Sequence, residues 1–173
     1  FGRVEWNETV GRFGAVVIGA RQILVAYNVN VNEKDAKAAK IAGSLVRSTG
    51  RLLKQDDGRR TRIPGMLPMV QGMGLPLEAH GISQVSMNLR DVNVTPMHIA
   101  FEAVKSIVND HGVDTHGSEL VGLVPLSAMI ESGKWYAEDG CEDEKELVDA
   151  AIKGLGLDAL GPFIATERII DWA

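Results

Sequence analysis

Amide and hydroxyl side chains recur at every second position in two stretches of this chain, "QILVAYNVNV" and "QVSMNL". The polar positions are Asn28, Asn30, Gln84, Ser86 and Asn88. A primary amide donates and accepts hydrogen bonds at once, which suits a heterocycle that presents both kinds of group. The row is therefore a candidate ligand-binding surface, and a solvent-facing polar side of a sheet is the competing interpretation.

One histidine lies where acid–base chemistry would be possible. The sequence predicts that Thr95 caps a helix, that Pro96 occupies its first position and that His98 follows in the first turn. The positive end of the helix dipole would favour a neutral imidazole. Because no partner for His98 can be read from the sequence, we interpret it as structural. Asp91 and Asn93 are interpreted as turn and capping residues rather than catalysts.

Composition excludes several classes of function. The net charge of −5 argues against a general nucleic-acid binder, whose surface would be basic. No apolar run approaches the roughly 20 residues of a membrane span. The single cysteine, Cys141, fits a cytoplasmic protein, and the four histidines show no metal-ligand spacing with it. We therefore expect no nucleic acid, membrane or metal partner.

A basic segment lies between residues 47 and 62 of this acidic chain. Its cations are Arg47, Arg51, Lys54, Arg59, Arg60 and Arg62. A solvated surface loop is the common reading of such a run. The sharper interpretation is a docking site for an anionic tail of a substrate.

Hydrophobic periodicity predicts an alternation of strands and helices. Strands are expected at 23–31, 69–74, 84–90 and 119–124, and helices at 32–50, 95–112, after Pro125 and at 142–153. Asn32 is the expected cap of the first helix, and 50–65 the expected basic loop. This order predicts an α+β, ferredoxin-like βαββαβ sandwich with additional C-terminal helices. Right-handed crossovers put both helices on one face and leave the polar row on the other.

Several stretches resemble a known family when they are taken together and in order. They are "GARQILVAYNVNV", "AAKIAGSLVR", "MVQGMG", "QVSMNLRDVNVTPMH", "GSELVGLVPLSAM" and "LGLDALGPF…ERIIDW". They are similar to the C-terminal subdomain of the glutamate formimidoyltransferase family, the transferase half of formimidoyltransferase-cyclodeaminase. The resemblance runs from about Phe13 to Trp172. It implies a ferredoxin-like domain over 21–173, preceded by a lead-in loop at 1–20.

The resemblance implies a transferase of histidine degradation and one-carbon metabolism. In that family a formimidoyl group moves from N-formimidoyl-L-glutamate to N5 of tetrahydrofolate, which is a co-substrate, and no metal takes part. Two subdomains enclose the folate in a tunnel. The implied folate-binding residues are Arg12, Phe13, Gly14 and Ala15 of the lead-in loop, with Asn28, Asn30, Ser86 and Asn88 of the polar row. Phe13 stands where the family often has a tryptophan, and either ring can stack on a pterin.

The resemblance also implies partners. The family's catalytic histidine lies in an N-terminal subdomain, and none of the histidines of this chain matches it, so no catalytic residue is expected here. Because the chain begins at Phe1, we expect part of a longer or divided protein that needs an N-terminal half and forms a homo-oligomer. Arg59, Arg60 and Arg62 are expected to meet a poly-γ-glutamate tail of folate. The alternatives are a non-catalytic folate-binding module, or a related activity on 5-formyl- or methenyl-tetrahydrofolate.

Overall fold

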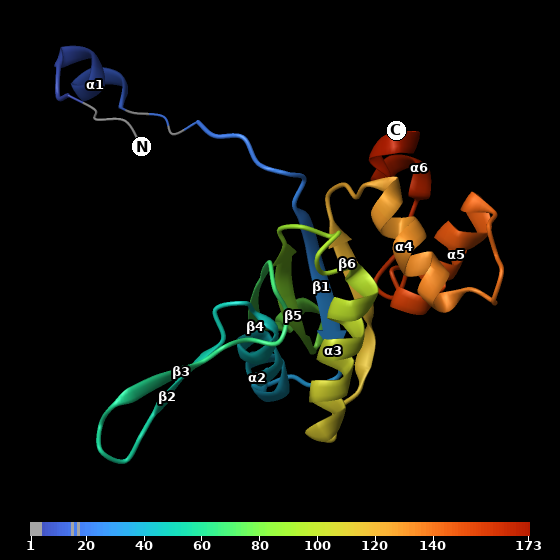
Figure 1. Cartoon of the computed structure of the whole chain (residues 1–173), viewed down its shortest axis with the longest axis horizontal. Helices are drawn as coiled ribbons and strands as arrows, with labels where there is room; N and C mark the ends of the chain where they lie inside the picture. Colours follow the sequence, from blue (N-terminus) through green and yellow to red (C-terminus); the bar gives the residue numbers. More distant parts are fainter. Residues whose placement is uncertain (1–4, 15, 17) are drawn as a thin grey trace.

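The computed structural model describes residues 5–14, 16 and 18–173. Its main feature is a four-stranded antiparallel sheet in the order β4-β5-β1-β6. The strands are β1 (Val25–Val31), β4 (Val70–Leu77), β5 (Ile82–Leu89) and β6 (Thr115–Val121). Helices α2 (Lys37–Val46) and α3 (Met97–Asp110) lie over the same face of this sheet (Figure 1). The expected α+β, ferredoxin-like βαββαβ arrangement is confirmed.

The core lies between the sheet and the two helices. The side chains of β1 that point toward α2 and α3 are Val25, Tyr27, Val29 and Val31, and all four are fully buried. Val85, Met87 and Leu89 extend this surface on β5. Ala100, Val104 and Val108 repeat at helical spacing on α3 and meet it. Each fully buried aliphatic side chain of this size contributes roughly 1.5–3 kcal/mol, so this face holds the fold together.

Two glycines let α2 lie close to β4. A methyl group added at Gly43 would lie 2.6 Å from the carbonyl carbon of Met73. One added at Gly74 would lie 2.2 Å from the carbonyl carbon of Ala39. Both contacts involve backbone, which cannot move aside cheaply. Gly43 of α2 and Gly74 of "MVQGMG" therefore serve helix packing rather than a turn.

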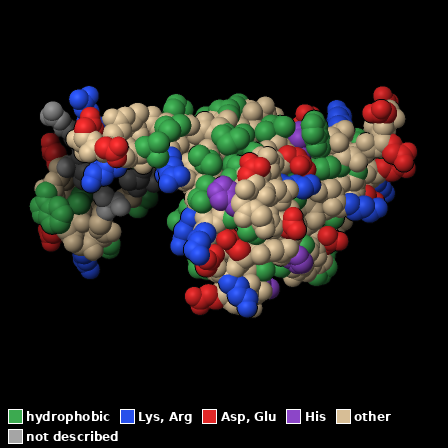
Figure 2. Space-filling view, turned by 90° about the horizontal axis from the view of Figure 1, so that it is seen from below, with side chains coloured by type: hydrophobic (Ala, Val, Ile, Leu, Met, Phe, Trp, Pro, Cys, Tyr) green, Lys and Arg blue, Asp and Glu red, His purple; other side chains and the backbone are tan. Residues whose placement is uncertain are grey.

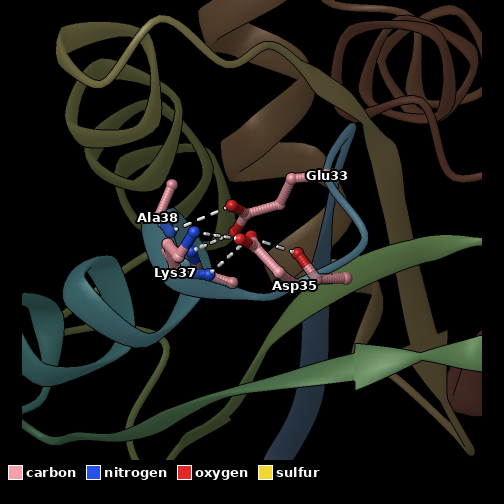
Figure 3. Close-up of polar contacts among 6 residues, drawn as sticks. Glu33, Asp35, Lys37 and Ala38 are labelled. Carbon is pink, nitrogen blue, oxygen red and sulfur yellow. Dashed lines mark hydrogen bonds and ion pairs between the residues drawn. The ribbon is translucent and has the colours of Figure 1, made fainter.

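The first crossover helix begins later than predicted. Asn32 does not cap it, because α2 starts at Lys37 and Ala36 precedes it in the left-handed conformation (φ 55°). The carboxylate of Glu33 replaces the missing cap: it accepts from Ala38 N at 3.1 Å and from Ala39 N at 2.7 Å. Figure 3 shows this side chain reaching over the start of the helix. The long side chain of Glu33 thus satisfies first-turn amides of a helix that begins five residues later than Asn32.

The second crossover helix is also capped differently from the prediction. Pro96, not Thr95, holds the cap position of α3, and the proline side chain makes no capping hydrogen bond. Thr95 Oγ1 instead donates to the carbonyl oxygen of Pro68 at 2.6 Å. This hydrogen bond links the residue before the α3 cap to the segment that precedes β4.

Two segments outside the sheet have more structure than expected. The predicted basic loop contains a hairpin of β2 (Arg51–Lys54) and β3 (Arg60–Ile63), which projects from the body (Figure 1). All eight strand residues are exposed, so no buried face marked them in the sequence. Within the lead-in, α1 (Glu8–Phe13) forms a short helix whose cap, Asn7, accepts from Val10 N at 2.9 Å.

The C-terminal part consists of the additional helices that the sequence predicts. α4 (Leu126–Tyr136) and α5 (Glu144–Leu155) lie where helices were expected, and α6 (Ala165–Arg168) and the short 3-10 helix η2 (Ile170–Trp172) follow them. The other 3-10 helix, η1 (Glu78–His80), lies between β4 and β5. The preceding strand, β6, ends at Val121 rather than 124, where Gly122 takes a φ of 87°. Within the described part of the chain, no helix has the length and apolarity needed to cross a membrane.

Candidate functional site

Four polar side chains form a hydrogen-bonded network on the sheet face opposite α2 and α3. Gln84 Nε2 donates to Asn30 Oδ1 at 2.8 Å and to Glu119 Oε2 at 3.1 Å. Asn28 Nδ2 lies 3.4 Å from Glu119 Oε2 and 3.5 Å from Gln84 Oε1. Asn30 Nδ2 donates to the carbonyl oxygen of His116 at 3.3 Å. The network therefore joins β5, β1 and β6 across this face.

The amides of this network are not exposed to solvent. Asn30 is 0% exposed, Gln84 4% and Asn28 9%. Buried polar groups destabilise a fold unless they are paired, and these are paired with one another. Asn28 and Asn30, which we expected to contact a ligand, thus bind neighbouring side chains and set the geometry of the face.

Ser86 and Asn88 differ from the buried network. Both are half-buried, and among the described residues neither side chain makes a hydrogen bond within the chain. Strand pairing places Ser86 opposite Met73 and Asn88 opposite Gln71. Met73 is 60% exposed and supplies an apolar surface beside the two polar groups. A flat, polar ring could therefore pair with Ser86 and Asn88 while it packs on Met73.

The predicted residues of the lead-in lie away from this face. Arg12, Phe13 and Gly14 are exposed at the end of α1, which Figure 1 shows separated from the sheet by an extended segment. The Arg12 guanidinium lies 5.2 Å from the centre of the Phe13 ring. Ala15 falls outside the described residues. The structure does not bring Arg12, Phe13 and Gly14 together with Ser86 and Asn88.

The predicted arginines of the basic segment lie on the β2–β3 hairpin. Because Lys54 pairs with Arg60 and side chains alternate along a strand, Lys54, Arg60 and Arg62 share one face of the hairpin. Arg62 Nη1 also donates to the carbonyl oxygen of Thr49 at 2.7 Å. Arg59 lies at the turn and pairs with Asp57 at 2.9 Å. The hairpin and α1 project from different places on the body, so these two predicted groups do not meet (Figure 1).

The wider surface carries both signs of charge. Figure 2 shows acidic and basic side chains interspersed on the face that it presents, rather than a single basic area. Within the described part of the chain, no group of three or more histidine, cysteine or acidic side chains is placed to hold a metal ion.

Sequence reasoning missed Glu119, which accepts hydrogen bonds from Asn28 and Gln84. Its position follows from the pairing of Asn28 with Glu119 across β1 and β6. The alternation of "SELV" could have placed Glu119 and Val121 on one side of a strand. Which residues it faces depends on the register between strands that are far apart in sequence, and no local pattern gives that register.

His98 lies on α3, on the side of the sheet opposite this site. It is 5% exposed, and its ring stacks on Trp135 with the ring centres 5.2 Å apart and the planes at 16°. Burial lowers the pKa of His98 below its ordinary value, against the opposing influence of Glu131 and Glu102. A neutral, stacked imidazole in this position agrees with the structural interpretation.

Comparison with known proteins identifies the family to which this chain belongs. Residues 26–173 match the model of the formiminotransferase domain. The chain belongs to the formiminotransferase domain family. It is 36% identical over 166 residues to formimidoyltransferase-cyclodeaminase of Mus musculus, an alignment that covers 94% of this chain. It is also 34% identical to glutamate formimidoyltransferase of Thermoplasma acidophilum (strain ATCC 25905 / DSM 1728 / JCM 9062 / NBRC 15155 / AMRC-C165). This second alignment extends over 140 residues and covers 81% of this chain.

The formiminotransferase domain described here is shorter than these relatives. It spans 29% of the length of the mouse protein and 42% of the archaeal one. The match to the family model begins one residue after the first residue of β1 and includes the rest of the sheet. The polar face therefore lies within the matched region, whereas Arg12 and Phe13 precede it.

Proposed function

We propose that this chain forms one side of a folate site in an enzyme that transfers a formimidoyl group from N-formimidoyl-L-glutamate to N5 of tetrahydrofolate. The family assignment supports the reaction type, and the archaeal relative carries the name glutamate formimidoyltransferase. The observation that carries the proposal is the pair Ser86 and Asn88, half-buried and without partners in the described chain, beside the exposed Met73. Such a surface suits one face of a pterin.

The proposed role of the sheet is to hold the folate ring in place. The ring of tetrahydrofolate presents both donors and acceptors, which an amide such as Asn88 can bind in either sense. The buried network of Asn28, Asn30, Gln84 and Glu119 keeps β5 and β1 in register beneath it. Preorganised positioning of this kind lowers the entropic cost of bringing two substrates together.

The reaction itself is a displacement at the formimidoyl carbon. The N5 nitrogen of tetrahydrofolate forms a bond to that carbon and loses its proton, the bond from the carbon to the glutamate nitrogen breaks, and the departing nitrogen gains a proton. The acid that this face presents among the described residues, Glu119, already accepts hydrogen bonds from Asn28 and Gln84. We therefore propose that the acid–base group comes from an N-terminal subdomain, on the same polypeptide or a separate chain.

Other features of the complete enzyme are proposals of the same kind. The lead-in, with Arg12 and Phe13, would close over the folate once the N-terminal subdomain is present. The enzyme would act in the cytoplasm, where the lone Cys141 stays reduced, and would assemble as a homo-oligomer.

A transfer assay tests the proposed function. The chain is combined with the N-terminal subdomain of its own protein, and formation of 5-formimidoyl-tetrahydrofolate from N-formimidoyl-L-glutamate is measured. We expect product from the complete protein and none from residues 1–173 alone. Absence of product from the complete protein contradicts the proposal: folate binding without turnover would then indicate a binding module, and conversion of 5-formyl- or methenyl-tetrahydrofolate a related one-carbon enzyme.

A further inference from the structure

A pocket of about 520 Å³ lies at the end of the polar sheet face, where β1 begins and β5 ends. Its lining residues are Arg21, Gln22, Leu24, Met69, Arg90 and Asp91. Because Val25 pairs with Leu89, the adjacent Leu24 and Arg90 point to the same side as Ser86 and Asn88. The pocket therefore continues the polar face, and Arg90 follows Asn88 at a spacing of roughly 7 Å along the strand.

The pocket carries two positive charges and one negative charge. Arg21 and Arg90 are exposed, and among the described residues neither forms an ion pair. The side chain of Arg90 contacts Met69, with Nη2 3.7 Å from Sδ. A guanidinium group binds a carboxylate through two parallel hydrogen bonds, so the two arginines suit a ligand with two carboxylates.

The wall of the pocket keeps an unfavourable backbone conformation. Met69 has a φ of 56°, in the left-handed region that costs a side chain other than glycine about 1 kcal/mol or more. Its carbonyl oxygen accepts from Arg90 N at 2.9 Å, and the preceding Pro68 accepts from Thr95 Oγ1 at 2.6 Å. These bonds fix the backbone at Pro68 and Met69, from which the Met69 side chain contacts Arg90. Strain that is kept in place by its surroundings is common at ligand sites.

The third charged group, Asp91, is fixed by its own loop. Its Oδ1 accepts from Asn93 N at 3.0 Å and from Asn93 Nδ2 at 3.2 Å. Among the described residues no group donates to Oδ2, so this oxygen can accept from a cationic ligand group. The pocket thus offers two cations and one fixed anion.

We propose that this pocket binds the glutamate moiety of the formimidoyl donor, a proposal that rests on the proposed function. Arg21 and Arg90 bind the two carboxylates, and Asp91 accepts from the protonated amidine. A glutamate moiety also ends the tail of a folate, but there its nitrogen belongs to an uncharged amide. N-formimidoyl-L-glutamate combines two anions with one cation and so matches the charges of the pocket. Its position next to Asn88 places the donor beside the proposed pterin surface.

Steady-state kinetics of the complete protein distinguish the two sources of glutamate. The variants are Arg21→Gln, Arg90→Gln and Asp91→Asn, with Lys153→Gln, an exposed cation on α5, as the control. We expect each pocket variant to raise the KM for N-formimidoyl-L-glutamate about tenfold or more while the KM for tetrahydrofolate monoglutamate stays within twofold. A rise in the KM for tetrahydrofolate with an unchanged donor KM overturns the assignment to the donor.

A binding measurement makes the test independent of turnover. Glutarate has two carboxylates and no nitrogen, and its binding to the complete protein can be followed by calorimetry. Arg21→Gln and Arg90→Gln should weaken glutarate binding at least fivefold, whereas Asp91→Asn should leave it unchanged or tighten it. Equal glutarate affinity in the wild type and both arginine variants overturns the proposal, even if no transfer activity is found. Urea unfolding of each variant checks that the fold is intact.

Discussion

Gln84 is the residue that joins the polar network on the sheet, because it donates to both Asn30 and Glu119. Gln84→Leu would leave the fully buried Asn30 Oδ1 without its donor, and we expect the free energy of unfolding to fall by about 1–3 kcal/mol. Gln71→Leu, an exposed position on the same face, should change it by less than about 0.5 kcal/mol. Urea unfolding measures both. Equal losses would show that the network does not stabilise the sheet.

The stability of the chain should depend on pH through His98. Burial lowers the folded pKa below the ordinary value of 6.5, so the unfolded chain binds a proton first as the pH falls. The stabilisation is therefore present above pH 6.5 and is lost below it. His98→Phe keeps a ring against Trp135 and removes the titration. Urea unfolding at pH 7.5 and 5.5 measures how much the free energy of unfolding falls between the two pH values. The fall should be smaller in His98→Phe than in the wild type, and equal falls in both would contradict the role of His98.

At the residue scale, sequence alternation predicted which side chains share a face but not what each one does. Asn28 and Asn88 look alike in the sequence, yet one is bound within a buried network and the other has no partner in the described chain. The difference follows from their neighbours: Glu119 lies opposite Asn28, whereas Ala26 and Gln71 flank Asn88. Only the pairing of distant strands determines these neighbours.

Among the elements, α2 depends on a cap that precedes it by several residues. Glu33 accepts from Ala38 N and Ala39 N, and its Oε1 also accepts from Ser83 Oγ at 3.2 Å. Glu33→Ala should lower the free energy of unfolding by about 1–2 kcal/mol, as loss of a helix cap does. Lys34→Ala, the exposed neighbour, serves as the matched control and should have little effect. A comparable loss in both variants, measured by urea unfolding, would argue against capping by Glu33.

The β2–β3 hairpin allows its two faces to be compared directly. We propose that Arg60 and Arg62, with Lys54 beside them, bind the polyglutamate tail of a folate. The double variant Arg60→Gln/Arg62→Gln should then weaken binding of a polyglutamylated folate more than that of the monoglutamate, and less so at high salt. Arg51→Gln removes a cation on the opposite face of the hairpin. It should not change the preference for the polyglutamylated folate over the monoglutamate. Equal weakening of both folates in calorimetry would refute the proposal.

Strands and helices that bury one face were predictable, whereas exposed or irregular segments were not. The period of two in β1 and β5 and the helical period in α3 correspond to buried surfaces that the structure contains. The hairpin was taken for a loop because all of its strand residues are exposed. Asn32 was a reasonable cap by residue type, but α2 begins only at Lys37, where the longer Glu33 side chain reaches the first-turn amides.

For the whole molecule, the order of elements largely determined the topology. Two right-handed crossovers and one hairpin leave few ways to place four strands, and the observed order β4-β5-β1-β6 is the ferredoxin-like one. Local sequence could not place α1 or the hairpin relative to the sheet, because neither buries an apolar face against it. The same reasoning explains why the predicted site residues are divided: the sheet residues gather on one face, whereas α1, with Arg12, and β3, with Arg60, lie elsewhere (Figure 1).

The central claim is that the sheet face carrying Ser86 and Asn88 binds the folate. The most direct test is the dissociation constant of the complete protein for tetrahydrofolate, with and without Asn88→Leu, which removes the amide at similar volume. We expect the constant to rise about tenfold, equivalent to roughly 1.4 kcal/mol, with unfolding unchanged. Ser106→Ala, on the exposed side of α3, should leave it unaltered. An unchanged dissociation constant in Asn88→Leu would contradict the claim.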